Sequence, residues 1–305
     1  MAKAKVGLVL GGGGARGLAH IGIIKRLNAY GIPIDIITGA SMGAIIGAAY
    51  AQTKNINYIE STFRSYITGS EYQSLKTRAF NFNKAEEPES FLHYISKIVK
   101  RRIVINLAAN RTSLIQDKFL KSALAQLLNH EKIEETQIPF ACTALDLVSG
   151  REIVFRAGDL LKAVQASASI PGFLPPVDES GKRLVDGAVI DNFPIKTTRE
   201  MGAEFIIVCD VSPELEYNPP LNNVVDIFIR AHHAAVHRLN ILTRQEADMV
   251  LKPEIGSINW TEFEQIDTLI KKGEAIVDKH IVAIKKRYAR MNWPWKKIRR
   301  RMQQW

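Results

Sequence analysis

The sequence predicts an α/β protein whose central sheet is mostly parallel and carries helices on both faces. Over residues 5–212, short apolar runs typical of buried strands alternate with patterns typical of amphipathic helices. Glycines at 11–14 separate the first run from the first helical pattern, and a glycine-rich turn at 39–43 separates the second pair. Strand, turn and helix in repeated succession favour a parallel sheet that is buried on both sides.

The individual elements follow from the same patterns. The apolar strand runs lie at 6–10, 34–38, 139–147, 152–155, 184–188 and 204–211. The helical patterns lie at 18–27, 44–52, 160–168 and 195–201. The dipeptide Ser149-Gly150 between two strand runs is typical of a hairpin, so one antiparallel pair is expected.

Residues 53–137 break this alternation. Aromatic and basic side chains mix there with polar ones, and no strong strand run is present. We predict a helical, lid-like insertion over the edge of the sheet, inside a domain that spans 5–212. Two interpretations stay open: an ordinary helical subdomain, or a lid that presents apolar side chains to an apolar substrate. Residues 213–284 are predicted to be a helical extension of the same domain, with a short strand near 250–255.

The composition indicates a soluble protein of a reducing compartment. With 305 residues, 46% of them hydrophobic, the chain can bury one large core. Cys142 and Cys209 both lie in apolar strand runs and are expected to be buried free thiols, not parts of a disulfide or a metal cluster. No apolar run has the length of a membrane span or of a secretory leader. We therefore expect a cytoplasmic protein.

The formal charge of +10 is concentrated at the end of the chain. Residues 285–305 carry nine basic side chains and no acidic one, interleaved with Tyr288, Trp293, Trp295 and Trp305. This mixture suits the interface of an anionic membrane, where basic residues meet lipid head groups. Nucleic acid is the weaker alternative, and a solvated tail without a partner is the third. We favour peripheral binding at the inner face of a membrane.

The segment 39–43, Gly-Ala-Ser-Met-Gly, fits the pattern G-x-S-x-G between a strand run and a helix of small residues. In that context the pattern is typical of a nucleophile elbow, in which a serine sits at a strained bend above a helix N-terminus. A purely structural glycine turn is the alternative. We favour a catalytic Ser41, because two further motifs accompany it.

The loop 11–17, with the sequence GGGGARG, follows the first strand run and opens the first helix. Read from Gly12 it fits the dinucleotide fingerprint G-x-G-x-x-G, but that fingerprint needs an acid at the end of the second strand. Asp35, the nearest candidate, comes at the beginning of its strand, and no Walker-type lysine follows the loop. Glycines at a helix N-terminus can instead expose consecutive backbone N–H groups, which stabilise the oxyanion of an acyl intermediate. We favour that use, since adjacent strands would place the loop beside Ser41.

Ser41 needs a partner that accepts its proton. The histidines considered lie in helical patterns, at His20, His232, His233 and His237. We interpret them as packing or surface residues. The other candidate is Asp186, at the end of a strand run, where a carboxylate can meet the elbow across the top of a parallel sheet. A simple Asp-Gly turn is the competing explanation.

Together these motifs resemble those of the patatin-like phospholipase family. The correspondence comprises G-G-G-x-R/K-G at 12–17, G-x-S-x-G at 39–43 and D-G-A/G at 186–188, in the order that the family has. A fourth segment, 165–175, is similar to the one that precedes the D-G-A strand in these proteins. The likeness spans about residues 5–212 and points to the small bacterial members of the neuropathy-target-esterase type.

The resemblance implies a three-layer patatin-like fold and a Ser–Asp dyad that needs no histidine, metal or cofactor. Ser41 would be the nucleophile and Asp186 the proton acceptor in the hydrolysis of fatty-acyl esters of phospholipids or lysophospholipids. The oxyanion hole would come from the loop residues Gly12, Gly13, Gly14, Ala15 and Arg16. The motif positions that support these turns would be Gly17, Gly39, Gly43, Gly187 and Ala188.

Two alternatives remain beside this interpretation. Arg16 can orient the loop, contact a lipid phosphate or form a structural ion pair. The whole chain can also be a weakly active or inactive adaptor that keeps the fold for binding at a membrane surface.

Overall fold

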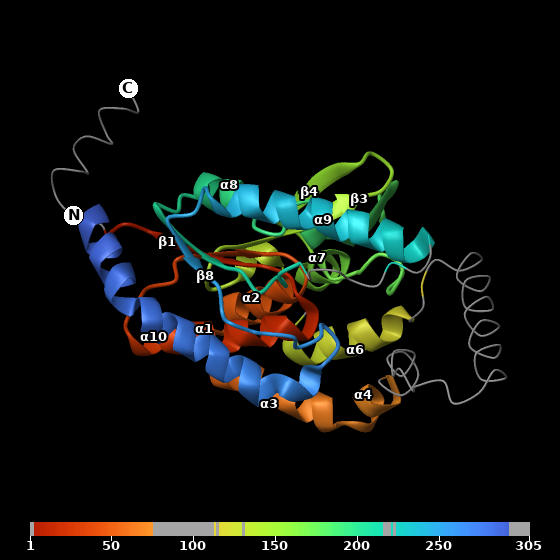
Figure 1. Cartoon of the computed structure of the whole chain (residues 1–305), viewed down its shortest axis with the longest axis horizontal. Helices are drawn as coiled ribbons and strands as arrows, with labels where there is room; N and C mark the ends of the chain where they lie inside the picture. The colour runs from red at the N-terminus through yellow and green to blue at the C-terminus, as the bar shows by residue number, and fades with distance from the viewer. Residues whose placement is uncertain are drawn as a thin grey trace.

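The computed structural model describes residues 3–75, 113, 116–129, 132–215, 221 and 224–292 (Figure 1). Its first elements are β1 (Val6–Leu10), the 3-10 helix η1 (Gly14–Leu18), α1 (Ala19–Ala29), β2 (Ile36–Gly39), α2 (Met42–Thr53), α3 (Ile56–Thr68), α4 (Ser70–Leu75), α6 (Asp117–Leu127) and η4 (Ile133–Glu135). Next come β3 (Phe140–Asp146), β4 (Arg151–Phe155), α7 (Leu160–Ser167), β5 (Val177–Glu179), β6 (Lys182–Asp186) and η5 (Gly187–Val189). The last are α8 (Ile195–Glu200), β7 (Phe205–Cys209), α9 (Val224–Arg244), β8 (Met249–Leu251), η6 (Phe263–Gln265) and α10 (Ile266–Met291).

One eight-stranded sheet forms the centre of the molecule. Its strands are ordered β5-β6-β3-β2-β1-β7-β8, and β4 pairs with β3 outside that path. The run β3-β2-β1-β7-β8 is parallel, whereas β4, β5 and β6 pair antiparallel. The predicted α/β fold with a mostly parallel sheet is confirmed, and so is the hairpin predicted at Ser149-Gly150.

The strand that ends at Asp186 is not one of the parallel strands, so the prediction that this carboxylate reaches the elbow across the top of a parallel sheet is wrong. The first residues of β3 pair with β2 and its last residues with β6, while β4 runs along β3 as well. Because β4 occupies one edge of β3, β2 and β6 share the other edge, end to end. In this register Gly39 lies beside Cys142, and Asp186 lies beside Ala144 two residues further on. β6 therefore runs toward the end of β2 and delivers Asp186 to the elbow.

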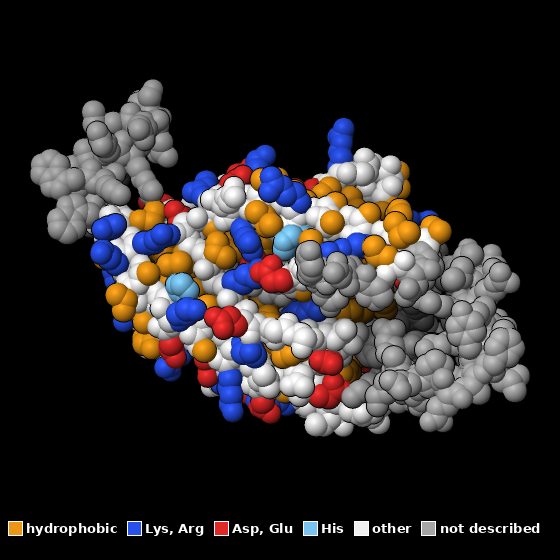
Figure 2. Space-filling model, in the orientation of Figure 1, with side chains coloured by type: hydrophobic (Ala, Val, Ile, Leu, Met, Phe, Trp, Pro, Cys, Tyr) orange, Lys and Arg blue, Asp and Glu red, His pale blue; other side chains and the backbone are white. Residues whose placement is uncertain are grey.

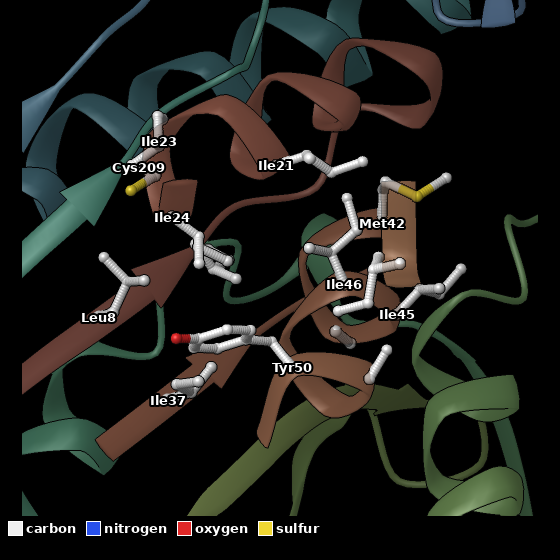
Figure 3. Close-up of a cluster of buried hydrophobic side chains, with 14 of the residues drawn as sticks. Leu8, Ile21, Ile23, Ile24, Ile37, Met42, Ile45, Ile46, Tyr50 and Cys209 are labelled. Carbon is white, nitrogen blue, oxygen red and sulfur yellow. The ribbon is translucent and has the colours of Figure 1, made fainter. Parts of the chain in front are cut away.

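Helices cover both faces of the sheet. On one face, side chains of β1, β2 and β7 pack against α1, α2, α3 and α10 in one large cluster. Figure 3 shows part of this cluster, with Leu8 and Ile37 of the strands facing Tyr50 of α2. On the other face a smaller cluster joins Val9 of β1 to Ile195 of α8. The sheet and its two helical layers thus give the three-layer arrangement that was expected.

The last helix, α10, lies along α1 (Figure 1). Glycines make this contact possible: a Cβ added at Gly22 would stand 2.0 Å from the carbonyl oxygen of Ile270, and one at Gly273 would stand 2.0 Å from that of Ala19. Any larger residue at either position would push the two helices apart. Since β8 also joins the sheet, residues 213–284 contribute both a strand and a covering helix.

The described residues of the 53–137 insertion contain three α-helices and the short η4. Helix α3 packs against α1 and α2, and α6 packs against α3 and α7. Residues 76–112 lie outside the described part of the chain, so the lid-like arrangement stays a prediction there. In the basic tail, 285–291 form the end of α10, and 293–305 also lie outside the described residues. No helix within the described ranges has both the length and the hydropathy to cross a bilayer.

Candidate active site

Ser41 occupies the sharp bend between β2 and α2. Its backbone angles, φ 54° and ψ −126°, are ones that residues with a side chain rarely adopt. The bend is tight because Gly43 lies against β1, where an added Cβ would stand 2.0 Å from the carbonyl oxygen of Leu10. The backbone N–H of Ser41 donates to the carbonyl oxygen and to the hydroxyl oxygen of Ser167, at 3.2 Å in each case. These contacts fix Ser41 above the N-terminus of α2.

Asp186 lies close enough to Ser41 for the serine hydroxyl to lower the pKa of its carboxyl. Only 6% of Ser41 and 4% of Asp186 is exposed, so the pair is shielded from water. The carboxylate also accepts a hydrogen bond of 2.8 Å from the backbone N–H of Ala188. Burial is the largest effect on this carboxyl: it raises the pKa of Asp186 to about 6, although the hydroxyl of Ser41 and the bond from Ala188 act in the opposite direction. A carboxyl with this pKa is ionised at neutral pH and is a better base than an exposed aspartate.

The glycine loop lies directly against this pair, because β1 and β2 are neighbours. A Cβ added at Gly12 would stand 2.8 Å from Cβ of Ser41 and 2.9 Å from Cβ of Ala188. The backbone N–H of Gly12, however, donates to Oδ1 of Asn192 at 2.6 Å. The prediction that this N–H is a free oxyanion donor is therefore wrong.

Ala15 is also excluded as a donor, since its N–H is bonded to the carbonyl oxygen of Trp260 at 2.7 Å. Gly13 and Gly14 are different. They stand at the N-terminal end of η1, and no hydrogen bond to their N–H groups is present among the described residues. Gly14 also lines the same pocket as Ser41. Of the predicted loop donors, these two amides have the best placement for an oxyanion.

Arg16 anchors the loop from the side. Its Nε donates to the carbonyl oxygen of Ile258 at 2.7 Å, close to the bond between Ala15 and Trp260. The segment 258–260 thus clamps the outer half of the loop. This contact to a backbone oxygen fits the loop-orienting alternative and not a structural ion pair.

The remaining motif positions are close contacts between backbones. A Cβ at Gly187 would stand 2.2 Å from the carbonyl oxygen of Thr143, and one at Gly39 would stand 2.7 Å from the backbone of Gly43. At Gly17 an added Cβ would meet the side chain of Met42 at 2.4 Å. These positions let the loop, the elbow and the end of β6 converge.

No histidine takes part in the Ser41–Asp186 contact. His20 is buried, its Nε2 lies 2.8 Å from the carbonyl oxygen of Gly11, and its Nδ1 has no hydrogen-bond partner. Burial lowers the pKa of His20 to about 4, so the ring is neutral at physiological pH. His232, His233 and His237 lie on α9. Nor does the described part of the chain gather three His, Cys, Asp or Glu side chains that could hold a metal ion.

An apolar pocket of about 150 Å³ opens at Ser41. Its walls come from α2, α3, α4 and α6, from the loop after α7, and from Trp260 and Phe263. The lining residues are Gly14, Ser41, Met42, Ile45, Thr62, Phe63, Tyr66, Tyr72, Leu120, Ala123, Leu124, Leu127, Ala168, Ile170, Phe173, Leu174, Trp260 and Phe263. Its apolar lining suits a hydrocarbon chain.

Three residues that position the site escaped the sequence analysis as site residues. Asn192 holds Gly12, Ser167 holds the elbow, and Trp260 holds the glycine loop while packing edge-on against Phe173 at 4.7 Å between ring centroids. The similarity of residues 165–175 to the segment that precedes the D-G-A strand in the family is the sequence signal that could have identified Ser167 as a site residue. Asn192 follows Asp186 closely enough to be suspected, but no local pattern marks Trp260.

Replacing Asn192 by alanine is expected to lower the free energy of unfolding by about 1–3 kcal/mol, because the buried N–H of Gly12 loses its acceptor. Urea denaturation measures this loss. The matched control is Asn57→Ala at an exposed position of α3, which we expect to change stability by less than about 0.5 kcal/mol. Equal losses in the two variants would show that the bond to Asn192 does not hold the loop.

Comparison with known proteins places these motifs in a wider context. Residues 8–199 match the family model of the patatin-like phospholipases. The chain is 27% identical over 304 residues to lysophospholipase NTE1 of Debaryomyces hansenii, covering 91% of this chain and 18% of that protein. It is 28% identical over 295 residues to patatin-like phospholipase domain-containing protein 7 of Rattus norvegicus, covering 88% and 20%. The chain thus spans about a fifth of the length of these relatives.

Solved structures with a similar arrangement are more distant. VipD of Legionella pneumophila aligns with a TM-score of 0.46 and 15% identity, over 92% of this chain and 67% of VipD. ExoU in its complex with SpcU, from Pseudomonas aeruginosa, aligns with a TM-score of 0.44 and 15% identity, over 92% and 52%. The match to the family model covers more than half of the chain and contains the glycine loop, the elbow and Asp186. The chain belongs to the patatin-like phospholipase family.

Proposed function

We propose that this chain is a serine hydrolase that cleaves fatty-acyl esters of phospholipids or lysophospholipids. The observation that carries the proposal is the closeness of the Ser41 hydroxyl to the buried carboxylate of Asp186, beside an apolar pocket that Ser41 lines. Neither the fold nor ordinary packing requires a serine and a carboxylate to be buried together there. The names of the relatives, lysophospholipase and patatin-like phospholipase, agree with such a substrate.

In the first step, Oγ of Ser41 attacks the carbonyl carbon of the ester while Asp186 accepts the hydroxyl proton. Collapse of the tetrahedral intermediate breaks the bond to the alcohol, and the proton passes from Asp186 to that leaving oxygen. In the second step, Asp186 takes a proton from water, and the resulting hydroxide equivalent attacks the acyl-serine. The fatty acid leaves, and the proton returns to Ser41.

A carboxylate is a weak base for a serine hydroxyl, so the oxyanion must carry much of the stabilisation. The amides of Gly13 and Gly14 are the donors proposed for it, at the positive end of η1. In other serine hydrolases one donor of this kind lowers the barrier by roughly 2.7–4 kcal/mol. The raised pKa of Asp186 also makes its carboxylate a stronger base than the carboxylate of an exposed aspartate.

The decisive experiment combines covalent labelling with ester hydrolysis. We expect a fluorophosphonate to label Ser41 alone, and Ser41→Ala and Asp186→Asn to lower the hydrolysis of a medium-chain p-nitrophenyl ester by roughly 10⁴-fold or to assay background. Intact-mass and peptide mass spectrometry locate the adduct. The control, Ser61→Ala at an exposed position of α3, should label and turn over like the wild type. Unchanged hydrolysis in the Ser41 and Asp186 variants would favour the adaptor.

The pH dependence should report Asp186 as the base. Its carboxyl must be ionised to accept the proton, so kcat/KM is expected to fall about tenfold per pH unit below about 6 and to level off above it. The same profile is expected for His20→Ala, after correction for folded protein, and for His233→Ala on the exposed α9. If the decrease of kcat/KM at low pH disappears in either histidine variant, that histidine is the base.

The pocket should select the length of the acyl chain. Ala123→Trp places an indole in the pocket from α6 and should lower kcat/KM for long-chain esters at least about tenfold, while short-chain esters are spared. Ala125→Trp puts the same ring on the exposed side of the same helix and should leave both substrates unaffected. A series of p-nitrophenyl esters measures the split. Equal effects on short and long esters would mean that the chain binds elsewhere.

A further inference from the structure

Helix α9 shows an apolar stripe to solvent. Residues spaced three, four, seven or eleven apart share one side of a helix, and five of the six exposed large apolar residues of α9 follow this spacing, Ile229 being the exception. They are Val224, Ile227, Phe228, Leu239 and Leu242, and they are between 38% and 80% exposed. Figure 2 shows hydrophobic side chains gathered along this helix, with Lys and Arg among them. A surface helix of a globular protein normally turns its apolar side inward.

The C-terminal half of the opposite side of α9 faces the protein. Asn240 is buried there, and Arg244 forms an ion pair of 2.5 Å with the fully buried carboxylate of Asp210. Asp210 directly follows β7, the strand beside β1. The C-terminal end of α9 is therefore anchored by its polar side, and this anchor fixes the apolar stripe outward.

Helix α9 also lies close to the glycine loop. The pKa of His233 is lowered, first by partial burial, then by the charges of His232 and Arg230, and then by the positive charge of Arg16. Arg16 belongs to the glycine loop, which borders the pocket that opens at Ser41. The side of α9 opposite the stripe thus comes close to the glycine loop.

We propose that the apolar stripe of α9 is the surface with which the protein docks on aggregated anionic lipid. The inference rests on the proposed lipid substrate and names the element that meets it. Helices with an apolar side and an arginine-rich remainder lie in the head-group region of membranes, with the apolar side buried. α9 carries three arginines and one acidic residue, and exposed Arg238 borders the stripe.

A second copy of this chain fits the stripe less well. A symmetric pair would bring two helices of the same positive sign together, which costs free energy, whereas anionic head groups complement the arginines. The C-terminal anchor at Asp210 also leaves the stripe free of other described helices. Lipid is therefore the occupant to which the observations point.

The test uses the full chain in the Ser41→Ala background, so that lipid is not consumed. Sedimentation with vesicles of phosphatidylcholine and phosphatidylglycerol measures the affinity. The variants are Phe228→Asp and, as a milder change, Phe228→Ser. The matched control is Val282→Asp on α10, where the valine is 77% exposed and the phenylalanine on α9 is 75% exposed.

We expect Phe228→Asp to bind these vesicles at least about tenfold more weakly, and Val282→Asp to bind like the parent, because only the first removes apolar area that the membrane buries. Arg238→Gln should lose affinity for the anionic vesicles but not for pure phosphatidylcholine. Thermal unfolding should be the same for all variants, since the changed side chains are exposed. Unchanged vesicle binding of both Phe228 variants would overturn the proposal.

Two more readouts separate this proposal from its alternatives. Light scattering without lipid measures self-association, and a dimer that Phe228→Asp dissociates would overturn lipid docking in favour of a second copy. With Ser41 present, Phe228→Asp should hydrolyse a soluble short-chain ester like the wild type and vesicle lipid more slowly. Failure of the hydrolase proposal would appear in the soluble ester, whereas failure of the docking proposal appears only with vesicles.

Discussion

The structure depends on keeping one carboxylate out of water beside one hydroxyl. A carboxyl whose pKa is higher in the folded state favours folding at low pH and loses that advantage as the pH rises through its folded pKa. For Asp186, with a pKa raised to about 6, the ionised form therefore costs the folded protein roughly 3 kcal/mol at neutral pH. That cost must be offset elsewhere, and the large core on the α1, α2 and α10 face is where most apolar burial occurs.

Holding the carboxylate requires segments that are far apart in the chain. β6 brings Asp186 in from beyond the C-terminal end of β2, and the backbone N–H of Asp186 donates to the carbonyl oxygen of Ser169 at 2.9 Å. The same short segment holds the elbow through Ser167. Because the end of α7 and the residues directly after it hold both partners, the distance between the two backbones is set by a few hydrogen bonds. Asn192 and Trp260 do the same for the two halves of the glycine loop.

How far the sequence predicts this arrangement depends on the range of each interaction. The alternation of strands and helices, the elbow at Ser41 and the glycine loop are local patterns, and the structure brings the two motifs and Asp186 together. The direction of β6 could not be read locally, because it is fixed by which edge of β3 remains open beyond β2. Whether a loop amide is free or hydrogen-bonded depends on Asn192 and Trp260. These residues are separated along the chain by 180 residues from Gly12 and by 245 residues from Ala15. The sequence marks such partners only as ordinary polar or aromatic residues.

The pocket and α9 together address a difficulty that any enzyme of this kind faces. An acyl chain that crosses water on its way from a membrane to a protein pocket exposes its methylenes, at a cost of about 0.8 kcal/mol for each one. A pocket that is itself apolar regains this free energy only at the end of the path, so the crossing remains a barrier. If the protein sits on the lipid surface with the stripe of α9 immersed, the chain can pass from one apolar environment to another. The ion pair of Arg244 with Asp210, which directly follows β7, then holds α9 in a fixed position relative to the central sheet.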